Sequence, residues 1–230
     1  MTTLLSALLG MLQGVLLFCL GYQYFMAVAS IRQPRPASFP ASARTRFAVV
    51  IPAHNEAPVL AATLAHLQEQ AYPKELFDVH VVADHCSDDT ARVAEAGRAV
   101  AHERNGLPQG RKAYALQWLL ERVLWGPGDY DAVAIFDADS LVAPGFLTAM
   151  DGHLQAGVQV LQGQHIISNP GDGLVARLAA VDMRLNNRLR NQSRRNLGFS
   201  CRLMGDAMVL TTEVLRYHGW LGDTLTEDRE

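Results

Sequence analysis

The chain has 230 residues, of which 49% are hydrophobic and 19% are charged, and its formal net charge at pH 7 is −3. This length supports one sizeable α/β domain, and the negative charge argues against nucleic acid as a partner, because binding a phosphate backbone requires a basic face. The three cysteines, Cys19, Cys86 and Cys201, are scattered and show no zinc-ligand spacing, so we expect no zinc site and a reducing compartment.

Residues 4–31 are almost continuously apolar and uncharged, which is long enough for a membrane-spanning helix, since about 20 residues suffice. Four arginines follow at positions 32, 35, 44 and 46. By the positive-inside rule, this predicts a transmembrane anchor over residues 1–31 in the cell membrane, with the rest of the chain at its cytoplasmic face. A cleaved signal peptide, suggested by the small residues at 27–29, and a helix buried in the domain are the alternatives.

Residues 32–45 are rich in Pro, Ala, Ser and Arg and predict a linker. After it, apolar runs predict strands at residues 47–51, 77–83, 132–136, 158–167 and 203–210. Helical patterns predict helices at residues 57–70, from 87 onward, 112–125, 144–154 and 174–190. The alternation predicts one α/β domain over residues 46–230, with a mostly parallel sheet flanked by helices.

The first two strands both end in polar turns, and ligands of open α/β sheets bind at the carboxyl ends of the strands. Asp84 ends the second strand, where its carboxylate could accept a hydrogen bond from a ligand's ring N–H. The first strand runs into Pro52, Asn55 and Glu56. Asn55 and Glu56 fit either a cap for the following helix or contacts with a ribose.

The third acidic motif, Asp137-Ala138-Asp139, follows the apolar run at 132–136. Side chains two apart on an extended segment point the same way, so the two carboxylates should share one small space. Such a pair suits Mg²⁺ or Mn²⁺ bridging a diphosphate. The alternative is two exposed loop aspartates.

Two groups of cations are candidates for anion binding. Arg111 and Lys112 follow Gly110 at a predicted helix start, which favours phosphate oxygens, although a solvated helix end fits as well. A second group lies in and after the helix at 174–190, with arginines at 184, 188, 190, 194, 195 and 202. It fits either a solvated face or contact with anionic headgroups or a diphosphate.

The last motif, Thr226-Glu227-Asp228, follows an irregular stretch that contains Trp220. An acid beside an exposed tryptophan suits a sugar, because the ring offers an apolar platform and the carboxylate accepts a proton. An ordinary helix start is the alternative.

Together and in this order, the motifs resemble those of family 2 glycosyltransferases, especially the membrane-anchored cellulose, hyaluronan and poly-N-acetylglucosamine synthases. The resemblance implies a GT-A fold and inverting transfer of a sugar from a UDP-sugar to a carbohydrate or lipid-linked acceptor. It also implies the site: Asp84 on the uracil; Pro52, Asn55 and Glu56 in the first nucleotide loop; Arg111 and Lys112 at the nucleotide; Asp137 and Asp139 on nucleotide and metal; Asp228, beside Glu227, as general base; and Trp220 toward the acceptor.

The sequence departs from that family in ending two residues after Asp228, before the Q-x-x-R-W motif, which predicts a truncated catalytic domain. Two other functions compete. One is an inactive, membrane-tethered fragment that binds nucleotide-sugar. The other is a haloacid-dehalogenase-like phosphatase, whose later G-D-x-x-x-x-D pattern is matched by residues 222–228, although the lysine it requires is missing after Lys112.

Overall fold

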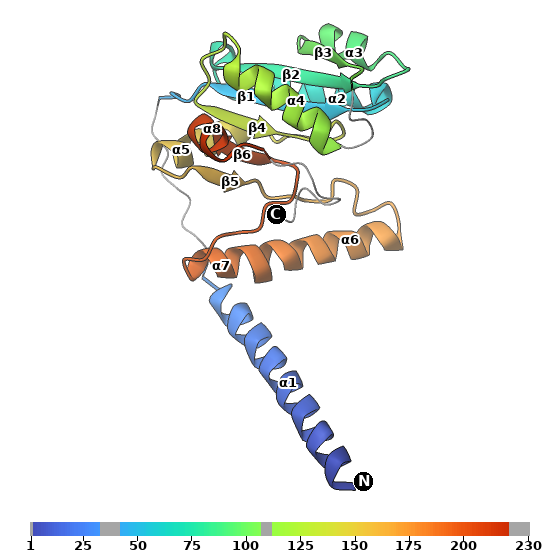
Figure 1. Cartoon of the computed structure of the whole chain (residues 1–230), viewed down its shortest axis with the longest axis vertical. Helices are drawn as coiled ribbons and strands as arrows, with labels where there is room; N and C mark the ends of the chain where they lie inside the picture. The colour runs from blue at the N-terminus through green and yellow to red at the C-terminus, as the bar shows by residue number, and fades with distance from the viewer. Residues whose placement is uncertain (1, 33–41, 107–111, 221–230) are drawn as a thin grey trace. The chain divides into compact units, whose positions relative to one another are not determined.

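The computed structural model describes residues 2–32, 42–106 and 112–220, and it groups the chain into two compact units (Figure 1). The sheet unit comprises Ala37–Gln164 and Leu203–Glu230, and the helical unit comprises Met1–Pro36 and His165–Arg202. The segment 165–202 therefore groups with the N-terminal helix in this division, and the single domain over residues 46–230 stays a prediction. Most of the predicted linker, residues 33–41, lies outside the described residues.

The sheet unit contains a six-stranded sheet in the order β3-β2-β1-β4-β6-β5. Its strands are β1 (Phe47–Ala53), β2 (Phe77–Asp84), β3 (Val100–Arg104), β4 (Ala132–Ile135), β5 (Val160–Gln162) and β6 (Met208–Thr211). β1 pairs in parallel with β2 and β4, and β2 pairs in parallel with β3, whereas β6 runs antiparallel to both β4 and β5. The sheet is thus mostly parallel, as the alternation of elements predicts.

Helices cover the sheet on both faces, so the central strand is buried along its whole length. The helices are α2 (Ala57–Gln68), α3 (Thr90–Ala96), α4 (Lys112–Trp125), α5 (Phe146–Gln155) and α8 (Thr212–His218), with a 3₁₀ turn η1 at Lys74–Leu76. Alternate residues of β1 enter different cores: Val49 packs with leucines of α2, and Val50 packs with leucines of α4. The strand therefore needs apolar side chains at every position, as its sequence has.

The sequence does not predict β3 or α8, and the strands predicted at residues 158–167 and 203–210 are longer than β5 and β6. β3 is an edge strand with a mixed sequence and only one buried residue, so it lacks an apolar run. β5 ends at Gln162. Beyond this point the Gln162 side chain replaces backbone pairing between β5 and the segment before β6: it donates to the Asp206 carbonyl (2.9 Å) and accepts from the Met204 N–H (2.7 Å). A side-chain amide that replaces backbone pairing leaves no hydrophobic pattern to read.

The helical unit consists of α1 (Thr2–Ala29), α6 (Leu174–Leu185), the π-helical segment η2 (Asn186–Gln192) and α7 (Ser193–Asn196). Within α1, Leu4–Ala29 has a mean hydropathy of 2.1 and is exposed, so by length and composition it could cross a membrane. The predicted helix at 174–190 is present, but it continues without a break through η2 into α7.

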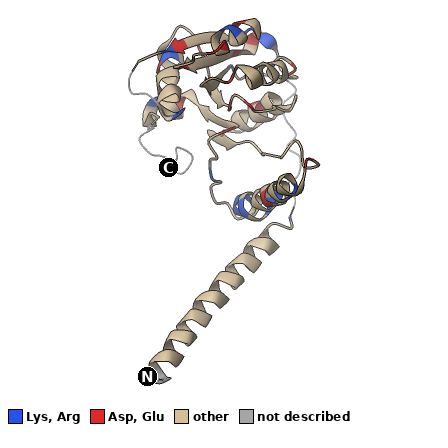
Figure 2. Cartoon of the chain, turned by 90° about the vertical axis from the view of Figure 1, so that its right-hand side faces the viewer, with Lys and Arg blue, Asp and Glu red and all other residues tan. Residues whose placement is uncertain are grey.

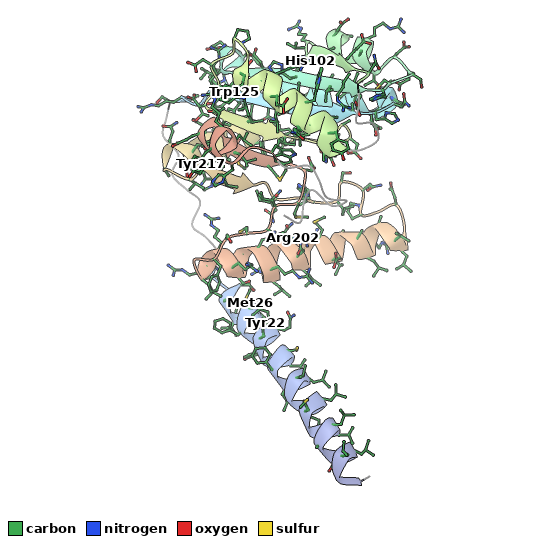
Figure 3. The ribbon with its side chains drawn as sticks, viewed as in Figure 1. Tyr22, Met26, His102, Trp125, Arg202 and Tyr217 are labelled. Carbon is green, nitrogen blue, oxygen red and sulfur yellow. The ribbon has the colours of Figure 1, made fainter. Side chains whose placement is uncertain are left out.

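A polar network ties together the strands at the β3 edge of the sheet. The His80 and His102 ring nitrogens lie 3.2 Å apart, and the other His80 nitrogen lies 3.0 Å from the Tyr130 hydroxyl, which donates to Asp78 (2.9 Å) (His102 is labelled in Figure 3). Burial, together with the charge on His102, lowers the pKa of His80 to about 4. His80 is therefore neutral in the folded protein at neutral pH.

We expect this network to make the sheet unit sensitive to acid. Because the pKa of His80 is lower when folded, the unfolded chain binds the extra proton between about pH 6.5 and 4, and stability falls as the pH falls through that range. The full shift corresponds to about 3 kcal/mol. The melting temperature of the detergent-solubilised chain should drop less over this range in His80→Gln than in wild type, whereas His218→Gln, at an exposed position, should behave as wild type. Equal acid sensitivity of wild type and His80→Gln would contradict this assignment.

Candidate functional site

A cleft of about 540 Å³ lies where β1, β2 and β4 end, at their carboxyl edges. It is lined by Pro52, Ala53, His54, Glu56, Asp84, His85, Lys112, Ala115, Asp137, Ala138 and Asp139. Six of the predicted site residues are in this lining: Pro52, Glu56, Asp84, Lys112, Asp137 and Asp139. Residues up to 87 positions apart in sequence, from Pro52 to Asp139, are brought together because parallel strands end at one edge.

The loops after β1 and β2 are bonded to each other. Asn55 has a positive φ of 55°, and its side-chain oxygen accepts from the Ser87 N–H at 2.8 Å. The His54 ring nitrogen lies 2.6 Å from the Asp84 carbonyl. Asn55 is not part of the cleft lining; its contacts fix one loop against the other.

The α2 N-terminus is capped from the second loop. The N–H of Ala57 donates to the Asp88 carboxylate (3.2 Å), and the N–H of Glu56 donates to the Thr90 hydroxyl (3.0 Å). The Glu56 side chain makes no capping hydrogen bond. Capping is thus supplied by other residues, and Glu56 is part of the cleft lining.

Asp84, the last residue of β2, is held from the neighbouring strand. Its carboxylate forms an ion pair with Arg104, which ends β3 and is 3% exposed, and the His85 ring nitrogen lies 2.9 Å from the same carboxylate oxygen. A buried charge requires such partners, which also fix its orientation. Sequence reasoning missed Arg104, because it lies in the strand that carries no apolar pattern.

Asp137 lies in an electrostatically crowded position. Lys112, the first residue of α4, forms an ion pair with its carboxylate and donates to the Gly205 carbonyl (3.1 Å). Burial raises the pKa of Asp137, and the nearby Asp206 and Asp139 raise it further against the opposing effect of Lys112. Asp137 therefore has one lysine and two carboxylates as neighbours, and a further cation would relieve the repulsion among the three carboxylates.

Asp206 is a site residue that the sequence did not indicate. Its carboxylate accepts from the Asp137 N–H (2.9 Å), the Ser140 hydroxyl (2.9 Å) and the Ala207 N–H (2.7 Å). These bonds hold the Asp137–Asp139 loop from the far side. In the sequence this residue is marked only by the dipeptide Gly205-Asp206 just before β6, and so short a pattern does not indicate a site.

The described residues include no group of three or more His, Cys, Asp or Glu side chains arranged to hold a metal ion. Mg²⁺ is commonly held by one or two carboxylates, with substrate phosphates and water completing its shell. Asp137 and Asp139 provide that donor set, so the residues present fit a divalent cation whose remaining ligands come from a bound diphosphate.

The remaining predicted site residues are not among those that line the cleft in the described part of the chain. Arg111, Glu227 and Asp228 lie outside the described residues. Trp220 lines a separate cavity of about 270 Å³ between α4 and α8 and packs on the core beneath it. The role of Trp220 at the acceptor stays a prediction.

Solved structures share this fold. The mannosyltransferase PcManGT from Pyrobaculum calidifontis, in complex with GDP-Man and Mn²⁺, is 24% identical with a TM-score of 0.65, and the match covers 91% of this chain and 56% of that one. S. aureus TarS 1-349 in complex with UDP-GlcNAc is 18% identical with a TM-score of 0.51, covering 75% and 47%. Glucosyl-3-phosphoglycerate synthase from Mycobacterium tuberculosis, with Mn²⁺, UDP and glucosyl-3-phosphoglycerate, is 22% identical with a TM-score of 0.52, covering 80% and 64%. The chain thus spans about half to two thirds of these structures. Comparison with curated protein sequences gives no significant match.

The mostly parallel sheet and these neighbours define a GT-A glycosyltransferase fold, which confirms the predicted fold class. A family model described as glycosyltransferase like family 2 matches residues 43–230, and the chain belongs to that family. The resemblance noted in the sequence is confirmed, and the phosphatase alternative finds no support.

We expect Asp206 to be required for donor binding although it is not in the cleft lining. Asp206→Ala removes the two hydrogen bonds that Asp206 accepts from Asp137 and Ser140, and loss of such outer support typically costs about tenfold or more in ligand or metal affinity. Calorimetric titration with UDP and Mn²⁺ would measure this, with Asp129→Ala, at an exposed position of the same unit, as control. Wild-type affinity in a folded Asp206→Ala protein would contradict the assignment.

Proposed function

We propose that the chain carries the donor site of an inverting glycosyltransferase that moves a sugar from a UDP-sugar to a hydroxyl group of a polysaccharide or lipid acceptor. The observation that supports this most directly is the convergence of Asp84, Lys112, Asp137 and Asp139 in one cleft at the strand ends. That cleft offers a base-recognition group at one side and a charged, phosphate-binding group at the other.

The nucleoside end of the donor is assigned to the β1 and β2 loops. Asp84, fixed by Arg104, accepts a hydrogen bond from the uracil ring N–H. Glu56 lines the same cleft with its carboxylate unused in capping, and it suits the ribose hydroxyls. The bonds between the two loops keep both acceptors in place before the nucleotide arrives.

The diphosphate end is assigned to Lys112, Asp137 and Asp139. A divalent cation held by the two aspartates would offset the charge that develops on the leaving diphosphate. Lys112 adds a positive charge at the start of α4, where it can exchange its bond to Asp137 for a phosphate oxygen. Both groups favour the departing, more highly charged diphosphate over the intact donor, which is the condition for catalysis.

The acceptor step is assigned to Asp228. Its carboxylate takes the proton of the acceptor hydroxyl while the hydroxyl oxygen attacks the anomeric carbon from the face opposite the diphosphate. The bond to the diphosphate oxygen breaks, and the configuration at the anomeric carbon inverts. This role is supported by the Thr226-Glu227-Asp228 motif and its place in the family.

We assign the reaction to the cytoplasmic face of the cell membrane, with α1 as the anchor. The apolar length of α1 and the arginines that follow it support this placement.

Donor binding should depend on a divalent metal through Asp139. The detergent-solubilised chain titrated with UDP should bind more tightly with Mn²⁺ than without, because a cation held by Asp139 would offset the charge of the diphosphate. Asp139→Ala should abolish this metal-dependent gain, Asp84→Ala should weaken UDP with or without metal, and Asp129→Ala should match wild type. A metal effect of wild-type size in Asp139→Ala would refute the metal assignment, and tighter binding of GDP than of UDP would refute the choice of uridine.

Transfer should depend on Asp228 and binding should not. Asp228→Asn should lower turnover of labelled UDP-sugar by at least ~100-fold while UDP affinity stays unchanged, because a general base acts only after the donor has bound. Asp223→Asn, five residues away, is the matched control and should retain turnover. Undiminished turnover in Asp228→Asn would show the base to be elsewhere, and absence of turnover in wild type with intact UDP binding would favour the inactive nucleotide-sugar-binding alternative.

A further inference from the structure

The helix α2 carries one hydroxyl on a buried face that is otherwise made of leucines. Its buried residues are Leu60, Thr63, Leu64 and Leu67. A hydroxyl that is removed from water costs free energy unless it forms a hydrogen bond, and a helical threonine often donates to the carbonyl one turn earlier. Here the Thr63 hydroxyl donates to the Ala138 carbonyl, 75 positions away, at 2.7 Å. This buried hydroxyl therefore connects α2 to a distant loop.

The carbonyl that Thr63 binds lies between the two aspartates of the cleft. The Ala138 carbonyl and the Asp139 N–H share one planar peptide group, so a hydrogen bond to this carbonyl also fixes the start of the Asp139 backbone. At the other end of the same loop, the Asp137 N–H donates to Asp206 (2.9 Å). The Asp137–Asp139 backbone is thus held at two points, from α2 and from the segment before β6.

The side chains of the two aspartates differ in how they are held. The Asp137 carboxylate forms an ion pair with Lys112. Asp139 is exposed, and within the described residues its side chain has no hydrogen-bond or ion-pair partner. The position of the Asp139 carboxylate therefore depends on its own backbone, and so on the peptide group that Thr63 holds.

A second buried contact of the same kind lies just after α2. Gln70 is 4% exposed, donates to the Ala143 carbonyl (2.8 Å) and accepts from the Leu147 N–H (3.1 Å). α2 itself contains no Lys, Arg, Asp or Glu and is tan in Figure 2, so it adds no formal charge beside the aspartates. Thr63 and Gln70 therefore support one segment through neutral groups, at Asp139 and beyond it.

We propose that Thr63 is a positioning residue for the divalent cation, because its hydroxyl sets the place of the Asp139 carboxylate through the Ala138 peptide. Thr63 is not among the described residues that line the cleft, so it acts through Ala138 and not by contact with the donor. This inference rests on the proposed function, in which Asp139 holds the cation. Asp84, at the nucleoside end, is held separately by Arg104. Loss of the Thr63 hydroxyl should therefore weaken only the metal-dependent part of donor binding.

Substitutions at Thr63 test the hydroxyl separately from the methyl group. Thr63→Val keeps the shape of the side chain and removes the donor, whereas Thr63→Ser keeps the donor and removes the methyl group. Gln70→Met removes the neighbouring buried contact and is the matched control for general loosening of the segment. Each detergent-solubilised full chain is titrated calorimetrically with UDP, with and without Mn²⁺. The ratio of the two affinities is the metal-dependent gain, and the melting temperature reports on folding.

The metal-dependent gain should fall about tenfold or more in Thr63→Val, which is the loss typical of removing a group that orients a metal ligand. The gain should keep its wild-type size in Thr63→Ser and in Gln70→Met, although Gln70→Met loses two buried hydrogen bonds and should melt at a lower temperature. UDP affinity without metal should be equal in all four chains.

Several results would overturn the proposal. A gain of wild-type size in folded Thr63→Val would show that the hydroxyl does not position Asp139. An equal loss of the gain in Thr63→Ser or in Gln70→Met would show an effect of packing or of general loosening. A parallel loss of UDP affinity without metal in Thr63→Val would show that the whole cleft is disturbed.

Failure of the proposed function gives a different result in the same experiment. A wild-type chain that binds UDP without any metal-dependent gain, or does not bind UDP, would refute the proposed donor site and this inference with it. A gain that is present in wild type and undiminished in Thr63→Val would refute this inference alone. If Thr63→Val does not fold, Thr63→Cys, whose thiol is a weaker donor, replaces it with the same expected loss.

Discussion

The parallel pairing of β1 with both β2 and β4 is the constraint on which the site depends. Ala53 pairs with Ala83, one residue before Asp84, and Val50 pairs with Ile135, two residues before Asp137. Fixed register brings the ends of three strands to one edge and therefore gathers polar side chains from three separate parts of the sequence. An offset of one residue in either pairing would turn a carboxylate away from the cleft, because successive side chains alternate between faces.

This arrangement gathers negative charge, and the surrounding residues limit its cost. Arg104 neutralises Asp84 within the protein, whereas Asp137 has a lysine but also two carboxylate neighbours. The two ends of the cleft therefore differ. The charge of Asp84 is balanced by Arg104, whereas the carboxylates around Asp137 repel one another, and an added cation would offset this repulsion. Such a difference suits a ligand that is neutral at its base and highly charged at its phosphates.

The sequence predicted much of this site because its signals are local. The apolar runs that lead into Asp84 and Asp137 predict both the positions of the strands and the carboxylates at their carboxyl ends. Arg104 and Asp206 were missed because their roles arise from pairing: Arg104 matters only once β3 lies beside β2, and Asp206 only once residues 205–207 lie beside the Asp137–Asp139 loop. The grouping of residues 165–202 with α1 was likewise hidden, since its contacts join residues more than 160 positions apart.

The hydrogen bonds that the Gln192 and Asn196 side chains donate to backbone carbonyls at the end of α1 also impose an order on biosynthesis. Gln192 lies 162 residues after Ser30, and Asn196 lies 167 after Ala29. At a translation rate of roughly 5–20 residues per second, α1 emerges on the order of ten seconds before these side chains exist. During that interval water or other groups must satisfy these last carbonyls, so the end of α1 is completed by the chain only after β1, β2 and β4 have been made.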